Sequence, residues 1–292
     1  MKLSVCLITY NHEAYIERAL QSVLEQKTSF DFEIVIGEDN SKDKTRYFCE
    51  DIARKYPGRI KLLAPCANLG MMENFLRTLA ACKGQFIAFL EGDDYWTDPQ
   101  KLEKQVSLLE SDPTLSACFH NVLAKYMRTG ENTERPFHQN LEKDLFETED
   151  LLAQWFIPTA SVVFVHYNDF EIPEWFRHCK SGDIPFLLLL SLRGKIRYIN
   201  SIMSVYRIHD QGMSATHHGY NKIVSMIYIY ESFNIHSNFR FHKKIREAEI
   251  YEIDRHYPKP AIAKPETSQK PATTSKLSKR ISGKLKKVLG LD

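Results

Sequence analysis

The chain has 292 residues, of which 43% are hydrophobic and 26% charged, and its formal net charge is +2. A chain of this length and composition can bury a full core, which excludes a disordered or fibrous protein. The charge is uneven, because residues 264–292 carry +6 and the total of +2 leaves −4 for residues 1–263. A slightly acidic body argues against general nucleic-acid binding, so no nucleic-acid partner is expected.

The six cysteines are scattered and form no C-x-x-C pair. This usage is typical of a reducing compartment, in which thiols stay free. The apolar start Leu3–Ile8 is too short for a signal peptide, and the apolar run Pro185–Leu192 is far below the ~20 residues that span a bilayer. The sequence therefore predicts a cytoplasmic protein.

Strand and helix patterns alternate through the first hundred residues. Continuous apolar runs predict buried strands at 3–9, 32–37, 59–63 and 85–90. Segments with one apolar face predict helices between them, and Asn11 is expected to cap the first of these helices. This alternation is typical of a doubly wound α/β sheet, which binds ligands at the carboxyl ends of its strands.

Two adjacent carboxylates follow the fourth predicted strand, in the sequence Glu91-Gly92-Asp93-Asp94. Because like charges repel, a divalent cation with oxygen ligands is a natural partner for them. Asp is also a common turn and cap residue, so a purely structural role is the alternative. Asp98 is expected to cap the next helix, with Pro99 at its first position.

The second half of the chain reads less regularly. A strand is predicted over 115–126, a polar variable loop over 127–147 and a further strand over 159–165. Asp183 precedes an apolar helix at 186–192, and a strand that carries Arg207 and His209 is expected in the segment that follows. A helical extension over 216–257, a flexible linker over 258–275 and a basic amphipathic helix over 276–292 complete the prediction.

The order of these motifs resembles the family 2 glycosyltransferases with the GT-A fold, of the kind that builds bacterial surface glycans. The resemblance rests on Thr9-Tyr10-Asn11, on the polar turn 38–45, on Asn68-Leu69-Gly70 and on Glu91-Gly92-Asp93-Asp94. It is strong over residues 1–125 and weaker to about residue 215. It implies a GT-A catalytic domain over 1–215, with a nucleotide-sugar half at about 1–125 and an acceptor half at about 126–215. A mostly parallel central sheet flanked by helices is therefore expected.

The resemblance also implies how the donor binds. Thr9, Tyr10 and Glu13 match positions that pack the nucleotide base and ribose, and Asp39 matches the carboxylate that accepts a hydrogen bond from the base, typically uracil. Asn68 and Gly70 match a turn beside the donor. The alternative is structural: Asp39 caps the following helix, and Asn68 and Gly70 only make a turn.

Asp94 matches the carboxylate that ligates Mn²⁺ or Mg²⁺, which bridges the diphosphate of the donor and stabilises the leaving group. The resemblance places Asp93 nearer the ribose or sugar. Trp96 could stack on an acceptor sugar or pack under the loop, and both interpretations are open.

Asp183 resembles the general base that takes the proton of the acceptor hydroxyl in an inverting transfer. The alternative is that Asp183 is only an N-cap. The segment from Tyr206 to Ser214 resembles a Y-R-x-H-x-x-G-x-S motif of the family. Alternation places Arg207 and His209 on one strand face, where Arg207 could meet the diphosphate and His209 the metal, or where both could be ordinary edge-strand residues.

The sequence thus predicts an inverting, metal-dependent glycosyltransferase that moves a sugar from a nucleotide diphosphate, a UDP-sugar, to a glycan or lipid-linked acceptor. Peripheral attachment to the inner face of the cell membrane through the basic 276–292 segment is expected, since such a helix binds anionic lipid. The alternatives are a nucleotidyltransferase on a related α/β fold and an inactive module that binds sugar nucleotides. A dinucleotide-binding oxidoreductase is disfavoured because the chain has no G-x-G-x-x-G.

Overall fold

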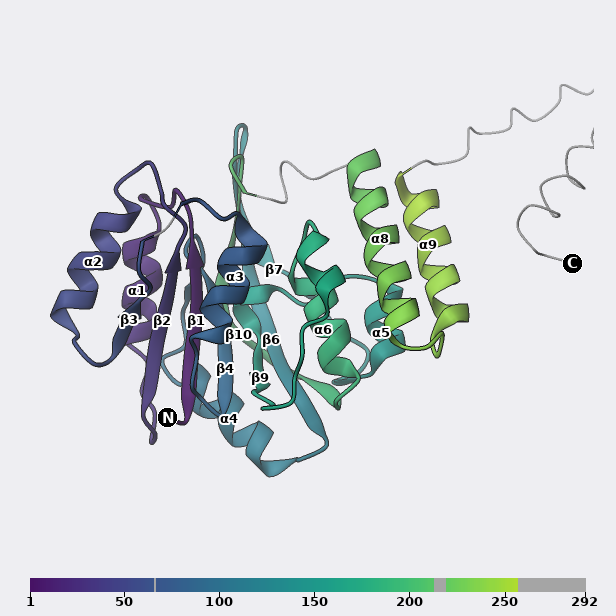
Figure 1. The fold of residues 1–292 in the computed structure, drawn as a ribbon, viewed down its shortest axis with the longest axis horizontal. Coiled ribbons are helices and arrows are strands. Elements are labelled where there is room, and N and C mark those ends of the chain that lie inside the picture. Colours follow the sequence, from purple (N-terminus) through teal and green to yellow (C-terminus); the bar gives the residue numbers. More distant parts are fainter. Residues whose placement is uncertain (66, 213–218, 257–292) are drawn as a thin grey trace, which may run out of the picture. The chain divides into compact units, whose positions relative to one another are not determined.

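A mixed sheet runs through the protein in the order β3-β2-β1-β4-β9-β6-β10-β5, with β7 and β8 added at β6 and β10 (Figure 1). The structure is a computed structural model, and it describes residues 1–65, 67–212 and 219–256. The strands in these ranges are β1 (Leu3–Thr9), β2 (Phe32–Glu38), β3 (Ile60–Leu62), β4 (Phe86–Glu91), β5 (Tyr95–Trp96), β6 (Leu115–Arg128), β7 (Glu131–Pro136), β8 (Leu145–Phe146), β9 (Val163–Val165) and β10 (Lys195–His209).

Helices cover both faces of the sheet. They are α1 (Ile16–Leu24), α2 (Thr45–Lys55), α3 (Met71–Ala80), α4 (Lys101–Ser111), α5 (Thr148–Ala153), α6 (Asp183–Ser191), α8 (Tyr220–His236) and α9 (His242–His256), with 3₁₀ turns at Thr159–Ser161 and Glu174–His178. Apolar side chains of α1, α2 and α4 form one core, and those of α3, α5, α6, α8 and α9 form the other. A sheet covered in this way must be apolar on both faces, which explains the unbroken apolar runs of β1, β2 and β4.

The short strand β9 runs against the strands on either side of it. The four strands β3, β2, β1 and β4 are parallel, whereas β9 pairs antiparallel with both β4 and β6. Beyond them β10 is parallel to β6 and antiparallel to β5. The predicted α/β class, with a mostly parallel sheet between helices, is confirmed.

Several local predictions were wrong. Asn11 does not cap α1, because the helix begins at Ile16 and Asn11 has a left-handed φ of 54°. The predicted loop 127–147 contains the β6–β7 hairpin, which turns at Gly130 with a φ of 84°, and β8. The segment that carries Arg207 and His209 is one long strand, β10, whose register with β6 shifts between Ile199 and Ser204.

The described C-terminal part packs on the rest of the fold. Figure 1 shows α8 and α9 side by side next to α6, and their buried side chains join the same core as those of α3 and α6. None of the helices in the described ranges is long and apolar enough to cross a membrane. The predicted linker over 258–275, the predicted basic helix over 276–292 and residues 213–214 of the family motif lie outside the described residues.

Helix α4 begins two residues later than the Asp98–Pro99 start predicted for it. Asp98 Oδ1 instead accepts a hydrogen bond from the backbone N–H of Gln100, at 2.8 Å. The first residue of α4 is Lys101, which is completely buried, and its Nζ has no hydrogen-bond partner among the described residues. Burial lowers the pKa of Lys101 to about 7.

This buried amine makes stability depend on pH. In the unfolded chain Lys101 keeps its ordinary pKa near ~10.4, so between pH ~7 and ~10 the unfolded state binds more protons than the native state. The native state is therefore penalised most below pH 7, and the penalty fades as the pH rises towards 10. We expect Lys101→Met to stabilise the protein relative to wild type by on the order of a few kcal/mol at pH 6, and by progressively less towards pH 10, in urea unfolding. A stability difference that stays the same from pH 6 to pH 10 would contradict a lowered pKa of Lys101 in the native state.

Candidate functional site

The loops that follow β1 and β2 are joined by hydrogen bonds at the carboxyl edge of the sheet. Asn11 and Asn40 take left-handed φ values of 54° and 58°, which Asn tolerates better than most residues. The Asn11 backbone N–H donates to Ser41 Oγ at 2.9 Å, and Asn11 Oδ1 accepts from the Lys42 N–H at 2.8 Å. Glu13 takes part as well, because its carboxylate accepts from the Lys44 N–H at 2.9 Å. These contacts fix the two loops against each other.

The four residues expected to contact the base and ribose differ in solvent exposure. Thr9 is 3% exposed and Asp39 2%, whereas Tyr10 is 37% exposed. Glu13 is exposed, although its carboxylate is held by the neighbouring loop. Thr9, Tyr10, Glu13 and Asp39 do come together at one edge, where their contacts with a nucleotide stay a prediction.

Asp39 holds the turn at residues 68–70. Its carboxylate accepts hydrogen bonds from Asn68 Nδ2 at 3.1 Å, from the Leu69 N–H at 2.8 Å and from the Gly70 N–H at 2.9 Å. Gly70 has a φ of 82°, which a residue with a side chain rarely adopts. The cap role proposed as the alternative for Asp39 is not what the structure shows, since its partners lie about 30 positions away along the chain.

The Asp93–Asp94 loop leaves β4 and is pinned by β10. The ladder pairs Tyr95 with Val205 and Trp96 with Ser204, and its continuation brings Arg207 beside the two aspartates. The backbone N–H of Arg207 donates to Asp94 Oδ1 at 2.8 Å, and the Arg207 guanidinium donates to the backbone carbonyl of Asp93. Asp94 is 1% exposed, and its second oxygen, Oδ2, is buried without a partner among the described residues.

Asp93 lies between two histidines. His209 Nε2 donates to Asp93 Oδ2 at 3.1 Å, and His12 Nε2 lies 3.8 Å from the same oxygen. The Nδ1 of His12 is 3.2 Å from Thr9 Oγ1. A glycine is required at position 92, because a Cβ there would lie 2.4 Å from Thr9 Oγ1 and 2.9 Å from His12 Nδ1.

The three carboxyl groups of the loop, on Glu91, Asp93 and Asp94, differ in how the protein shifts their pKa values. Burial and the charge of Asp93 raise the pKa of Asp94 well above its ordinary value. Burial also raises the pKa of Glu91 to about 8, with smaller contributions from Asp93 and Asp183. For Asp93 burial acts in the same direction, but the hydrogen bond from His209 and the nearby His12 lower its pKa below the ordinary value.

Asp183 approaches this loop from α6. Its Oδ2 accepts a hydrogen bond from Trp155 Nε1 at 2.7 Å, and its Oδ1 accepts one from Ser181 Oγ. Asp183 is half-buried and is the first residue of α6, whose N-cap is Gly182, so the N-cap alternative for Asp183 is wrong. Its charge is one of the smaller causes that raise the pKa of Glu91, so the two carboxyl groups lie in the same part of the fold.

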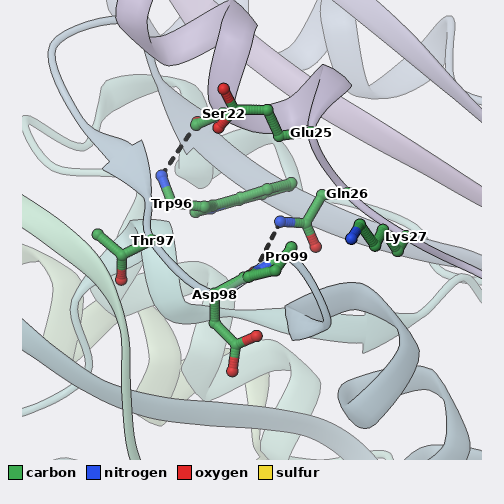
Figure 2. A pocket seen from close by; sticks show the side chains of 8 residues that line it. All are labelled: Ser22, Glu25, Gln26, Lys27, Trp96, Thr97, Asp98 and Pro99. Carbon is green, nitrogen blue, oxygen red and sulfur yellow. Dashed lines mark hydrogen bonds between the residues drawn. The ribbon is translucent and has the colours of Figure 1, made fainter.

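Trp96 does not face an acceptor. The indole is 1% exposed, its Nε1 donates to the Ala160 carbonyl at 3.1 Å, and it belongs to the core on the α1–α4 face. Figure 2 shows it over a pocket between the end of α1 and the start of α4, where its backbone N–H donates to Ser22 Oγ. The acceptor-stacking interpretation of Trp96 is therefore corrected to packing, and Asp93 and Asp94 do not line this pocket.

The residues at the loop fit a divalent cation only as part of a larger ligand set. Asp94 Oδ2 is a buried oxygen that finds no partner in the part of the chain that the structure describes, as expected of a ligand. No three acidic, histidine or cysteine side chains within the described ranges converge on one metal position. Mg²⁺ and similar ions are commonly held by one or two carboxylates together with substrate phosphates and water, and this site matches that description. His209 Nε2 is already used by Asp93, so its role as a metal ligand stays a prediction.

Three aromatic residues of the site were not predicted from the sequence. Tyr15 and Tyr95 hold the Arg207 guanidinium, whose centre lies 5.1 Å and 4.4 Å from their rings, and Trp155 holds Asp183. Aromatic side chains at such positions give no motif of their own, because their role depends on partners far away in the sequence. His12, by contrast, stands inside the Thr9-Tyr10-Asn11-His12 motif and could have been found there.

We expect Asp39→Asn to destabilise the protein by about 1–3 kcal/mol in the absence of any nucleotide, because an amide NH₂ would then face backbone N–H donors. The measurement is urea unfolding of the free protein. Asp51→Asn is the matched control. Asp51 is partly exposed and, within the described ranges, forms ion pairs with Lys55 and Arg54 of its own helix, so the unfolding midpoint should hardly move. Equal effects of the two substitutions would show that Asp39 does not support the turn.

Comparison with known proteins extends these observations. The sequence profile described as Glycosyl transferase family 2 matches residues 4–169. An uncharacterised protein of Mycobacterium tuberculosis is 34% identical over 218 residues, which cover 72% of this chain and 60% of that protein. An uncharacterised glycosyltransferase of a Nostoc species is 31% identical over 217 residues, covering 72% of this chain and 65% of the relative. The chain thus spans about 60% of the length of the mycobacterial relative.

Solved structures share the fold at low sequence identity. TarS 1–349 of S. aureus in complex with UDP-GlcNAc has a TM-score of 0.62 at 19% identity, over 88% of this chain and 73% of that one. The mannosyltransferase PcManGT from Pyrobaculum calidifontis, in complex with GDP-Man and Mn²⁺, has a TM-score of 0.56 at 12% identity, over 99% and 80%. Since the family profile covers more than half of the sequence, this chain belongs to glycosyl transferase family 2.

Proposed function

We propose that this chain transfers a sugar from a nucleotide diphosphate, a UDP-sugar, to a hydroxyl of a glycan or lipid-linked acceptor, with inversion at the anomeric carbon and with Mn²⁺ or Mg²⁺ as cofactor. The observation that carries the proposal is the buried, unpartnered Oδ2 of Asp94, at the carboxyl end of β4 beside an ionised Asp93. Family membership supports sugar transfer as the reaction. The TarS complex with UDP-GlcNAc and the PcManGT complex with GDP-Man and Mn²⁺ support a nucleotide-sugar donor and a cation.

The donor would lie along the edge formed by β1, β2 and β4. Tyr10 offers an exposed ring for the base, and Asp39 shapes the adjoining turn, so that the Asn68–Gly70 backbone borders the same space. Asp93, fixed by His209, is a hydrogen-bond acceptor for the ribose or sugar hydroxyls. Arg207 is held between two tyrosine rings close to the loop and contributes positive charge near the phosphates.

Asp94 Oδ2 would hold the cation, which when bound neutralises charge on the departing nucleoside diphosphate. Its other oxygen, Oδ1, is fixed by the Arg207 backbone N–H, so the side chain cannot turn away. The buried loop excludes water, which strengthens every charge interaction made there. The protein would thus help to stabilise the leaving group by holding the Asp94 carboxylate in place, with Oδ2 available to the cation.

Asp183 would accept the proton of the attacking acceptor hydroxyl. The indole N–H of Trp155 and the hydroxyl of Ser181 orient its carboxylate, and its half-buried position at the start of α6 leaves it accessible from the acceptor side. General-base catalysis contributes ~10²–10⁴-fold to such reactions. As Asp183 takes the proton, the hydroxyl oxygen would bond to the anomeric carbon from the face opposite the diphosphate. The bond between the sugar and the diphosphate breaks at the same time, and this geometry gives inversion.

The experiment that tests the proposal is transfer and donor hydrolysis across nucleotide sugars, with Mn²⁺ or with EDTA. We expect Asp94→Asn to lower metal-dependent turnover by at least ~10²-fold, and Asp183→Asn to lower transfer by ~10²–10⁴-fold while nucleotide binding persists. Asp169→Asn is the matched control, because Asp169 is an exposed carboxylate paired with Arg193. Full metal-dependent activity of Asp94→Asn would refute the metal assignment, and normal transfer by Asp183→Asn would require another base.

The proposed acceptor is glycan or lipid-linked, so a membrane surface is a proposed partner. This proposal rests on the sequence of residues 276–292. Apolar residues recur there at helical spacing among lysines and arginines, namely Leu277, Ile281, Leu285, Val288 and Leu289. We expect the full chain to float with vesicles that contain anionic lipid, and to lose this binding when residues 276–292 are deleted or the salt concentration is raised. Vesicle binding that survives the deletion would contradict this role for the segment.

A further inference from the structure

Four buried polar atoms on the α4 side of the sheet lack a hydrogen-bond partner among the described residues. They are Lys101 Nζ, Gln105 Oε1, His120 Nε2 and Ser204 Oγ, and all four residues are 0% exposed. Buried polar groups in folded proteins are normally paired, either with protein or with ordered water. Four exceptions in one region therefore need a common explanation.

The first three belong to one small region between α4 and β6. Lys101 and Gln105 are one helical turn apart on α4 and share a face. Gln105 Nε2 donates to the Cys118 carbonyl at 3.3 Å, and His120 is two residues further along β6 on the same side of the sheet as Cys118. The charge of Lys101 contributes to lowering the pKa of His120, which places the two side chains in the same surroundings.

The fourth atom joins the region through β5 and β10. Ser204 on β10 pairs with Trp96 on β5, so the two side chains emerge on the same side of the sheet. Lys101 Nζ lies 4.2 Å from the centre of the Trp96 ring. The indole thus covers the amine from the side of the carboxylate loop.

The hydrogen-bonding character of each atom follows from its neighbours. His120 Nδ1 is 2.7 Å from the Asn121 carbonyl, which can only accept, so Nδ1 carries the proton. Burial lowers the pKa of His120 well below its ordinary value, so the ring is neutral and Nε2 is an acceptor. Gln105 Nε2 donates to two backbone carbonyls, which leaves Oε1 as an acceptor. Lys101 donates, and the Ser204 hydroxyl can do either.

This set selects against ions. An anion would meet the lone pairs of His120 Nε2 and Gln105 Oε1. Below pH 7, where Lys101 is protonated, a metal cation would meet its ammonium group, and in surroundings of low dielectric such repulsion is strong. Water suits all four atoms, because it donates two hydrogen bonds and accepts two. Internal waters commonly make about three hydrogen bonds to buried polar groups that have no other partner.

We propose that Lys101, Gln105, His120 and Ser204 form an internal water-binding site, in which bound water donates to His120 Nε2 and Gln105 Oε1 and accepts from Lys101 Nζ and the Ser204 hydroxyl. The site joins α4 to the back of β5, the strand that follows Asp94. None of its four residues belongs to the proposed donor site, and the Trp96 ring that lies 4.2 Å from Lys101 Nζ is itself buried.

A crystal structure of the full chain, grown with sodium bromide, tests the proposal directly. We expect an oxygen-sized peak within hydrogen-bond distance of Lys101 Nζ and of at least one of the two acceptors, with no anomalous bromine signal there. A bromine signal would show an anion site and overturn the proposal. Direct hydrogen bonds among the four side chains, with no density between them, would overturn it as well.

Unfolding midpoints give a second test that does not depend on crystals. Lys101→Met and His120→Leu are measured singly and together, and if water links the two side chains the second substitution should shift the midpoint by less than half as much as it does alone. The matched control combines Lys101→Met with His138→Leu, since His138 Nε2 bonds the Phe156 carbonyl and lies in the other core region. The control shifts should add, and additive shifts for the Lys101–His120 pair would count against a shared water.

Discussion

The site depends on the short pairing between β5 and β10. This two-residue ladder brings the Arg207 N–H to Asp94, although the two residues are 113 positions apart in the sequence. Asp94 is buried and shares its surroundings with two further acidic residues, Glu91 and Asp93, so its ionised form is costly without a donor. A backbone N–H held by a ladder satisfies one of its oxygens without a mobile side chain. The rest of the carboxylate loop is arranged around that fixed point.

The loops that follow β1 and β2 are also held in place by hydrogen bonds to backbone N–H groups. Asp39, Asn11 and Glu13 each bind backbone N–H groups of a neighbouring loop, and a polar cluster at the ends of parallel strands thereby becomes a rigid edge. Rigid edges matter for group transfer, because a donor must be held within a fraction of an ångström of the attacking group. Asp39 and Glu13, which were expected at the donor, thus also support neighbouring loops, and the two roles are compatible, since a carboxylate offers several lone pairs.

The N-terminal half of the fold and the carboxylate loop could be predicted from the sequence, for a physical reason. Parallel strands covered on both faces must be continuously apolar, and the polar residues that end them stand out against this background. The hairpin strand β7 could not be found in this way, because its residues are mostly exposed and give no alternating pattern. The packing of Trp96 was equally hidden, since it is decided by Ala160 and Ser22, each more than sixty positions away.

The structure also divides the work between the two aspartates more sharply than the motif does. Asp93 has its carboxylate committed to His209, with His12 close by, and its pKa is lowered, so it is an ionised acceptor in a fixed orientation. Asp94 has one oxygen committed and one without a partner among the described residues. Its pKa is raised by burial and by Asp93 despite the nearby Arg207, so more positive charge is needed to stabilise its ionised form. A cation placed at Asp94 Oδ2 would supply that charge, whereas at Asp93 it would compete with the imidazoles already present. The physical chemistry of the site therefore favours Asp94 over Asp93 as the proposed metal ligand, independently of the family resemblance.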